Sequence, residues 1–165
     1  SMFQVAKLVG ETLREVIKTQ SGQDGPEAEA TFSATIILGG QIKGAPPRLF
    51  LIYPEGNFIE ASDDTPFFQI GETKYGRPIL VRAFDPEMSF EDAVKLLMVS
   101  FDSTIKANLS VNLPLDLHVY TADSLKHGTM TRIEKDDPYF NVISMGWGDA
   151  LKHAFNSLPP YSFTT

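Results

Sequence analysis

Leu49-Phe-Leu-Ile-Tyr-Pro-Glu-Gly-Asn-Phe-Ile-Glu-Ala61 is the stretch that decides the fold class, because it has the pattern of two strands joined by a turn. The runs 49–53 and 58–61 are rich in β-branched and aromatic residues, and Pro54-Glu-Gly-Asn57 between them supplies turn residues. The sequence therefore predicts a β-hairpin at this point.

Further elements flank the hairpin on both sides. Thr31-Phe-Ser-Ala-Thr-Ile-Ile-Leu38 predicts a strand that Gly39-Gly40 stops, and residues 3 to 19 predict an amphipathic helix whose apolar residues recur with a period near 3.6. After the hairpin, Phe67-Phe-Gln-Ile70 predicts one more short strand, broken by Gly71.

Three helices are predicted in the C-terminal half. Pro78 is placed in the first turn of a short helix that runs to about Phe84, and Ser89 caps a longer helix that ends near Asn108. Asp137-Pro138 starts the last helix, with a cap and a first-turn proline in the expected order. The apolar stripes expected to face the core are Val94, Leu97, Met98, Phe101 and Ile105 on the long helix and Phe140, Ile143, Trp147, Leu151, Phe155 and Leu158 on the last one.

Two strands complete the set, at Leu115-Asp-Leu-His-Val-Tyr120, where polarity alternates with period two, and at Met130-Thr-Arg-Ile-Glu134. Strands and helices are grouped along the chain instead of alternating. This order argues against a doubly wound parallel sheet and predicts an α+β fold with antiparallel sheets covered by helices.

The bulk composition predicts a single globular domain over residues 1–165. A formal net charge of -7 with scattered basic residues disfavours a nucleic acid partner, because phosphate neutralisation needs clustered Lys and Arg. The absence of cysteine excludes a thiol nucleophile and Cys-based zinc sites within these residues. No run approaches the length of about 20 apolar residues that a membrane span needs, so we expect no membrane partner.

No short motif by itself identifies a reaction that the protein catalyses. Gly39-Gly-Gln-Ile-Lys-Gly44 lacks the glycine pattern of a phosphate-binding loop and is interpreted as a turn. His118, His127 and His153 have no metal-ligand spacing, so no metal and no cofactor are expected. Asn108-Leu-Ser110 matches a glycosylation triplet, but glycosylation needs a secreted protein, which nothing in the sequence supports, and a turn between helix and strand also fits.

A set of ordered segments does carry a resemblance. The segments are Ala34-Thr-Ile-Ile-Leu-Gly-Gly40, Pro47-Arg-Leu-Phe-Leu-Ile-Tyr53, Gly56-Asn-Phe-Ile-Glu60, Phe68-Gln-Ile-Gly-Glu-Thr-Lys-Tyr-Gly76, Ser100-Phe-Asp-Ser-Thr104, Asn108-Leu-Ser110, Leu113-Pro-Leu-Asp-Leu117 and Asp137-Pro-Tyr-Phe140. In this order they cover nearly the whole chain. Together they resemble the C-terminal two-thirds of the ancestral beta-subunit (Anbu) branch of bacterial proteasome-type N-terminal-nucleophile hydrolases.

The resemblance implies a four-layer αββα sandwich, here incomplete at the N-terminal strands. It implies a threonine- or serine-type peptidase whose nucleophile is the first residue of the processed chain, activated by nearby groups and the free terminal amine. In that family the nucleophile, an Asp and a Lys lie in the first third of the subunit, ahead of the part that this chain resembles. Ser1 begins a helix instead of a strand, so we interpret it as a consequence of where the sequence starts, and we expect these 165 residues alone to be inactive.

Supporting site residues are carried over from the resemblance one by one. Ser110 matches a supporting Ser that the family places after its long helix, whereas the neighbouring Asp position falls on Ala107 or Asn108. A second supporting Ser normally follows the glycine before the short helix, where Glu72 or Thr73 would substitute. The candidate catalytic residues are therefore Ser110, Asn108 and Thr73, all in supporting roles.

The resemblance also implies a cytoplasmic homo-oligomer that acts on peptides or unfolded proteins. Contacts between copies are expected through helix faces, with a second apolar set on the long helix, Ala93, Leu96 and Val99, as the candidate. Two alternatives stay open: a non-catalytic ring or scaffold protein of the same fold, and a hydrolase of small amides.

Overall fold

The computed structural model describes residues 1–21 and 33–163 and contains four helices and two antiparallel sheets within them. The described chain divides into two compact units, one formed by Ser1–Gly71 with Tyr120–Gly128 and one formed by Glu72–Val119 with the residues from Thr129 onward. In chain order the elements are α1 (Met2–Ser21), β1 (Ile36–Gly40), β2 (Arg48–Ile52), β3 (Phe58–Glu60), α2 (Arg77–Ala83), α3 (Phe90–Ala107), β4 (Leu115–Val119), β5 (Thr129–Ile133) and α4 (Pro138–Ser157).

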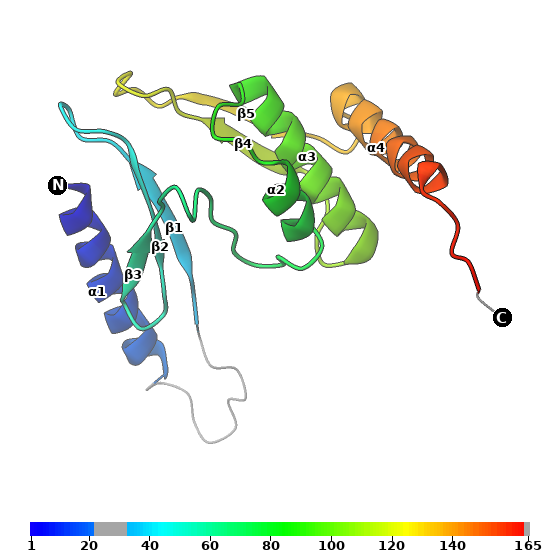
Figure 1. Cartoon of the computed structure of the whole chain (residues 1–165). Helices are drawn as coiled ribbons and strands as arrows, with labels where there is room; N and C mark the ends of the chain where they lie inside the picture. Colours follow the sequence, from blue (N-terminus) through cyan, green and yellow to red (C-terminus); the bar gives the residue numbers. More distant parts are fainter. Residues whose placement is uncertain (22–32, 164–165) are drawn as a thin grey trace. The chain divides into compact units, whose positions relative to one another are not determined.

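The first unit is a three-stranded antiparallel sheet, in the order β1-β2-β3, with α1 packed alongside it (Figure 1). Phe50 and Ile52 on the central strand are fully buried against apolar residues of α1, including Ala6 and Leu13. The Phe58 ring meets the Phe50 ring edge-on, with centroids 5.7 Å apart. The hairpin predicted from residues 49–61 is confirmed, because β2 and β3 pair in antiparallel register.

Two glycines bring backbone against backbone in this unit. A Cβ atom on Gly10 in α1 would lie 2.2 Å from the carbonyl oxygen of Gly56, and one on Gly56 would lie 2.7 Å from that of Gly10. Gly56 also has a φ of +88°, a conformation that suits glycine in the tight turn before β3. Glycine at both positions therefore lets α1 approach the hairpin closely.

The second unit combines the hairpin β4-β5 with α2, α3 and α4. Its core contains Met98, Ile133 and Phe140, with apolar residues of β4 packed against them. Both predicted caps are confirmed: Ser89 accepts a hydrogen bond from the backbone N–H of Asp92, and Asp137 accepts one from that of Phe140. These caps satisfy backbone donors that the first turn of a helix leaves without partners.

Two strand predictions are wrong. Residues 67–70 form no strand; they follow a turn closed by a bridge between Ser62 and Thr65, and Pro66 has no N–H to donate to a ladder. Gly39-Gly40 continues β1 instead of stopping it, with Gly40 paired to Arg48. A side chain at Gly40 would lie 3.0 Å from Cε of Met2, so glycine here makes room for α1. Residues 31 and 32 of the predicted first strand lie outside the described residues.

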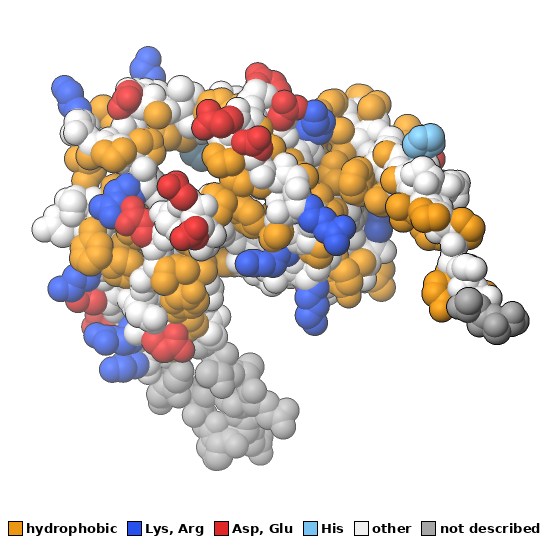
Figure 2. All heavy atoms as spheres, viewed as in Figure 1, with side chains coloured by type: hydrophobic (Ala, Val, Ile, Leu, Met, Phe, Trp, Pro, Cys, Tyr) orange, Lys and Arg blue, Asp and Glu red, His pale blue; other side chains and the backbone are white. Residues whose placement is uncertain are grey.

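The predicted apolar stripes are buried only in part. On α3, Met98 is buried, while Leu97 and Phe101 are exposed. On α4, Phe140 is buried near the start of the helix, but the apolar residues of its C-terminal end are exposed (Figure 2); these are Leu151, Phe155 and the C-cap residue Leu158. The apolar stripe of α4 is therefore longer than the surface of the described residues that packs against it. Among those residues, no helix is long and apolar enough to cross a membrane.

Candidate active site

The loop Gly71–Gly76 leads into α2 and supplies the first group of candidate residues. Gly71 has a φ of +77°, which a residue with a side chain rarely adopts. The next residue, Glu72, folds back so that its Oε1 accepts a hydrogen bond from the backbone N–H of Lys74 at 2.9 Å. The carbonyl of Thr73 accepts from the N–H of Arg77, so Thr73 lies directly ahead of α2.

The C-terminal end of α3 supplies the second group. The N–H of Asn108, the C-cap residue, donates to the carbonyl of Thr104 at 2.8 Å. Its Nδ2 donates to Oε2 of Glu72 at 2.9 Å, and its Oδ1 accepts from the backbone N–H of Ser110 at 2.8 Å. One amide side chain therefore joins the helix end, the loop before α2 and the following turn.

These hydrogen bonds stabilise the ionised form of Glu72. The bond from the backbone N–H of Lys74 is the main cause that holds the pKa of this carboxyl below its ordinary value of 4.5. Partial burial opposes the shift, and the bond from Asn108 supports it. The site therefore carries a fixed negative charge at neutral pH.

Gly76 holds the loop tightly against α3. A Cβ atom at this buried glycine would lie 2.2 Å from Oγ of Ser100 and 3.2 Å from Oγ1 of Thr104. Both residues are buried, and the Thr104 hydroxyl donates to the carbonyl of Ser100. Close packing at this glycine thus fixes where the loop 71–76 sits against the helix that ends at Asn108.

The structure thus brings Asn108 to the loop that contains Thr73, and it connects Ser110 to the same cluster through Asn108. Glu72, which the sequence offered only as an alternative to Thr73, is the loop residue that contacts Asn108. Nothing in the local sequence indicates this contact, because the two residues are 36 positions apart. Ser110 is exposed, and its hydroxyl makes no hydrogen bond with the described part of the chain.

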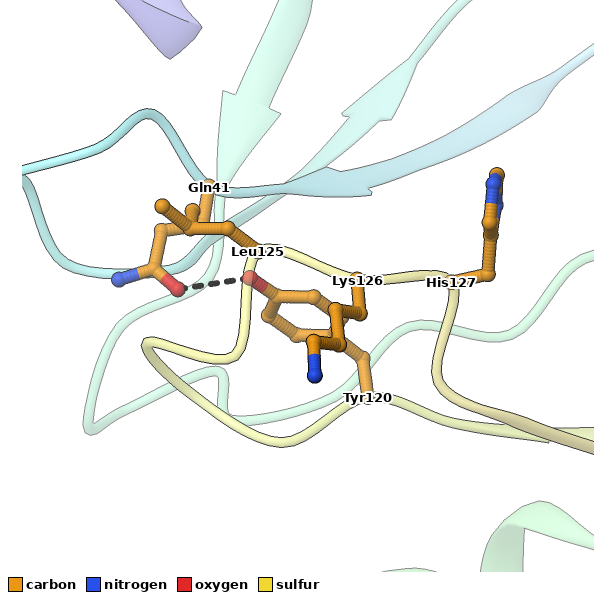
Figure 3. A pocket seen from close by; sticks show the side chains of 5 residues that line it. All are labelled: Gln41, Tyr120, Leu125, Lys126 and His127. Carbon is orange, nitrogen blue, oxygen red and sulfur yellow. Dashed lines mark hydrogen bonds between the residues drawn. The ribbon is translucent and has the colours of Figure 1, made fainter.

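A pocket of about 580 Å³ lies in the first unit, apart from the cluster around Asn108 (Figure 3). The side chain of Gln41, which lines this pocket, makes four hydrogen bonds. Its Oε1 accepts from the hydroxyl of Tyr120 and from the backbone N–H of Asp123, both at 2.8 Å. Its Nε2 donates to the carboxylate of Asp123 and to the carbonyl of Ala45. The side chains of Lys126 and His127 point in different directions (Figure 3). The polar groups of this pocket therefore stabilise two loops and do not converge on a ligand.

Two other features yield no site. Among residues 1–21 and 33–163, no cluster of three or more His, Cys, Asp or Glu is placed to hold a metal ion. Ser1 caps α1, and its terminal amine donates to Oε1 of Gln4 at 2.6 Å. The chain thus begins on a helix, as predicted.

Comparison with solved structures gives close matches along nearly the whole chain. Anbu (ancestral beta-subunit) from Yersinia bercovieri matches at 47% identity over 99% of this chain, with a TM-score of 0.89. Anbu from Hyphomicrobium sp. strain MC1 matches at 47% identity over 99% of the chain, with a TM-score of 0.87. A structure described as the helical assembly of the Anbu complex from Pseudomonas aeruginosa matches at 44% identity over 97%, with a TM-score of 0.89.

The chain spans 67%, 65% and 66% of the lengths of these three proteins, respectively. No family model and no curated protein matches it. The α+β arrangement of the described residues is therefore the one found over about two thirds of these solved structures.

Proposed function

The chain belongs to the Anbu (ancestral beta-subunit) family of proteasome-like peptidase subunits, and on this premise we propose that its complete subunit hydrolyses peptide bonds with an N-terminal nucleophile. The family's fold is that of the N-terminal-nucleophile hydrolases, and these residues form an incomplete version of it. The proposed nucleophile, a threonine or a serine, lies in the third of the fold that the 165 residues do not cover. These residues alone are accordingly proposed to be inactive.

The observation that carries the proposal is the cluster around Asn108. In this mechanism the nucleophile's hydroxyl attacks the scissile carbonyl, and the free terminal amine takes up its proton. The Ser110 hydroxyl, free of hydrogen bonds to the described residues, is available to the attacking group or its amine. Asn108 and Glu72 hold that turn in place, and the Glu72 carboxylate adds negative charge that favours a protonated amine.

Thr73, the neighbour of Glu72 in the loop, completes the proposed set. It precedes α2 and is half-buried. We assign it a supporting role in place of the family's serine at this position. Peptides and unfolded proteins are the proposed substrates, and the cytoplasm is the proposed location.

A homo-oligomer is the proposed state of the complete subunit. One relative is described as a helical assembly, and here the second half of α4 presents large apolar residues without partners among the described residues. Exposed apolar surface of this kind marks interaction sites more often than single exposed residues do.

The test uses the complete subunit, including the sequence ahead of Ser1, and fluorogenic peptides. We expect cleavage that is lost when the first residue of the processed chain is replaced by alanine, and that falls with Ser110→Ala at unchanged stability. Ser62→Ala, in the first unit, serves as the matched control and leaves the rate unchanged. Cleavage by the 165 residues alone, or an unaffected rate in the nucleophile variant, contradicts the proposal. An inert assembly favours the scaffold alternative, and an active monomer favours the hydrolase of small amides.

A further inference from the structure

A second cavity of about 580 Å³ lies entirely within the second unit, between α2, α3 and α4. Volumes from about 300 to 1,000 Å³ are typical of clefts that bury a small ligand. Leu96 and Val99 line this cleft from α3, and Val142, Gly146 and Trp147 line it from α4. The apolar set predicted on the long helix as a contact between copies thus includes two residues of this cleft.

Trp147 contributes a large aromatic side chain to the lining of this cleft. Its Nε1–H is buried beneath neighbouring residues and is therefore not open to an occupant of the cleft. An apolar or aromatic side chain placed beside the Trp147 ring would gain from the burial of apolar surface.

The segment after α4 has the properties of such a partner. Leu158 has φ -76° and ψ 145°, which are polyproline II values, and Pro159-Pro160 favours continuation of that conformation. Tyr161 and Phe163 are 79% and 85% exposed, and their rings meet edge-on, with centroids 4.9 Å apart. Figure 1 shows this segment leaving the end of α4.

Recognition of such segments follows a known physical pattern. Polyproline II segments dock in aromatic-lined grooves because they are already extended, lose little entropy on binding and leave their backbone carbonyls free. The Leu158–Phe163 segment supplies two aromatic rings. The Trp147 ring and the apolar side chains of the cleft supply the complementary groove.

Charge also permits this pairing between copies. The chain has a formal net charge of -7, so contacts between charged surfaces of two copies would be repulsive on average. Residues 154–163 contain no charged side chain, and the charged residues of the cleft, Asp92 and Lys95, form an ion pair with each other. A neutral segment entering a neutral cleft avoids the repulsion.

We infer that the Leu158–Phe163 segment of one copy docks into the α3–α4 cleft of a second copy, with Tyr161 and Phe163 as its apolar anchors. The inference rests on the proposed homo-oligomer and names one of its contacts. Each copy has one segment and one cleft. A copy that receives a segment in its cleft therefore still has its own segment free to bind the next copy, so such contacts can link many subunits.

The experiment uses the complete subunit in a cysteine-free background, since the 165 residues themselves contain no cysteine. One preparation carries Val142→Cys in the cleft and another carries Phe163→Cys in the segment. After mixing and mild oxidation, we expect a disulfide-linked dimer of the two variants. A control mixture pairs Phe163→Cys with Leu8→Cys, an exposed position on α1 outside the cleft, and yields only background cross-linking.

Two further measurements guard against a variant that simply misfolds. A synthetic peptide Leu-Pro-Pro-Tyr-Ser-Phe should reduce the cross-link, whereas a scrambled peptide should not. Trp147→Leu, which keeps an apolar side chain but removes the aromatic ring from the cleft lining, should weaken binding of that peptide to a subunit ending at Ser157 by roughly three- to tenfold.

The outcomes separate this inference from the proposed function. A cross-link within single chains that carry both cysteines, without dimers, shows that the segment folds back on its own cleft and overturns the inference. Control-level cross-linking by subunits that still assemble and cleave peptides overturns the inference and leaves the proposed function intact. If the cysteine variants form the cross-link but the subunit without substitutions does not cleave peptides, only the proposed function is contradicted.

Discussion

The side-chain amide of Asn108 donates a hydrogen bond to the carboxylate of Glu72 at 2.9 Å, across 36 positions of sequence. The bond connects the end of α3 to the loop before α2, two segments that the chain order alone does not place together. Asn108 also holds Ser110, so a change at this one residue alters both sides of the proposed site.

Replacement of Asn108 by alanine removes both of its side-chain hydrogen bonds. Each bond is worth about 0.5–1.5 kcal/mol net, so we expect a loss of about 1–3 kcal/mol in the free energy of unfolding, measured with urea. In the complete subunit we expect kcat to fall by about 10- to 100-fold with KM little changed, because misplacement of supporting groups affects the chemical step. Asn112→Ala is the control, since Asn112 lies just after that turn and its Oδ1 accepts a hydrogen bond from the adjacent N–H of Leu113. An equal loss of kcat in both variants would contradict the positioning role.

Glu72→Gln tests the charge at the site through its pH dependence. The pKa of Glu72 is lowered in the folded state, so its ionised form contributes stability that is fully present above the ordinary value of 4.5. That contribution is lost as the pH falls below 4.5 through the lowered pKa. We expect the urea midpoints of the two proteins to differ at pH 7 and to converge as the pH falls through this range. A difference that stays constant down to the acid end would refute the prediction.

Gly76→Ala should destabilise the second unit by steric conflict. The added methyl group meets Oγ of Ser100 at 2.2 Å, and overpacking of this kind costs about 1–3 kcal/mol. Ser100→Ala in the same chain removes that oxygen, so the double variant should be more stable than the sum of the two single changes predicts. Gly148→Ala is the matched control: its Cβ meets nothing within 4 Å, and alanine favours a helix interior by about 0.8–1 kcal/mol. Strictly additive effects at positions 76 and 100 would count against the clash.

Gln41 is the centre of the hydrogen bonds in the first unit, and its removal should free the loop after β4. In Gln41→Ala we expect the amide of Asp123, which donates to Gln41, to exchange with solvent faster by NMR. Tyr120→Phe removes only the hydroxyl bond to Gln41 and should cost about 0.5–1.5 kcal/mol with smaller changes in exchange. Unchanged exchange at Asp123 in the alanine variant would show that other contacts hold the loop.

Helix positions were predictable from the sequence because their signals are local. Ser89 and Asp137 cap their helices, and Pro78 lies in the first turn of α2, because each effect involves residues only a few positions apart. The strand at 67–70 was wrongly predicted because an apolar run does not reveal whether a neighbouring strand exists to pair with it. The role of Gly40 inside β1 depends on Met2, which only the tertiary structure places there.

The expected single domain stays a prediction. The described chain divides into two compact units, and such units can belong to one domain. Site residues were reached through a resemblance and not from spacing. Asn108, Ser110 and Thr73 keep their proposed roles, while the part of Glu72 emerged only from its contact with Asn108. Such a contact depends on how α3 and the loop before α2 pack, which depends in turn on the space left by Gly76.

The division into two units determines which part of the chain each spectroscopic signal reports during unfolding. The 165 residues contain one tryptophan, Trp147, and it belongs to the second unit, whereas helices occur in both. Indole fluorescence therefore follows the melting of the second unit alone, and far-ultraviolet circular dichroism follows both. Superimposable melting curves from the two signals would mark these residues as one cooperative unit, and a fluorescence change at a separate temperature would reveal a stepwise transition.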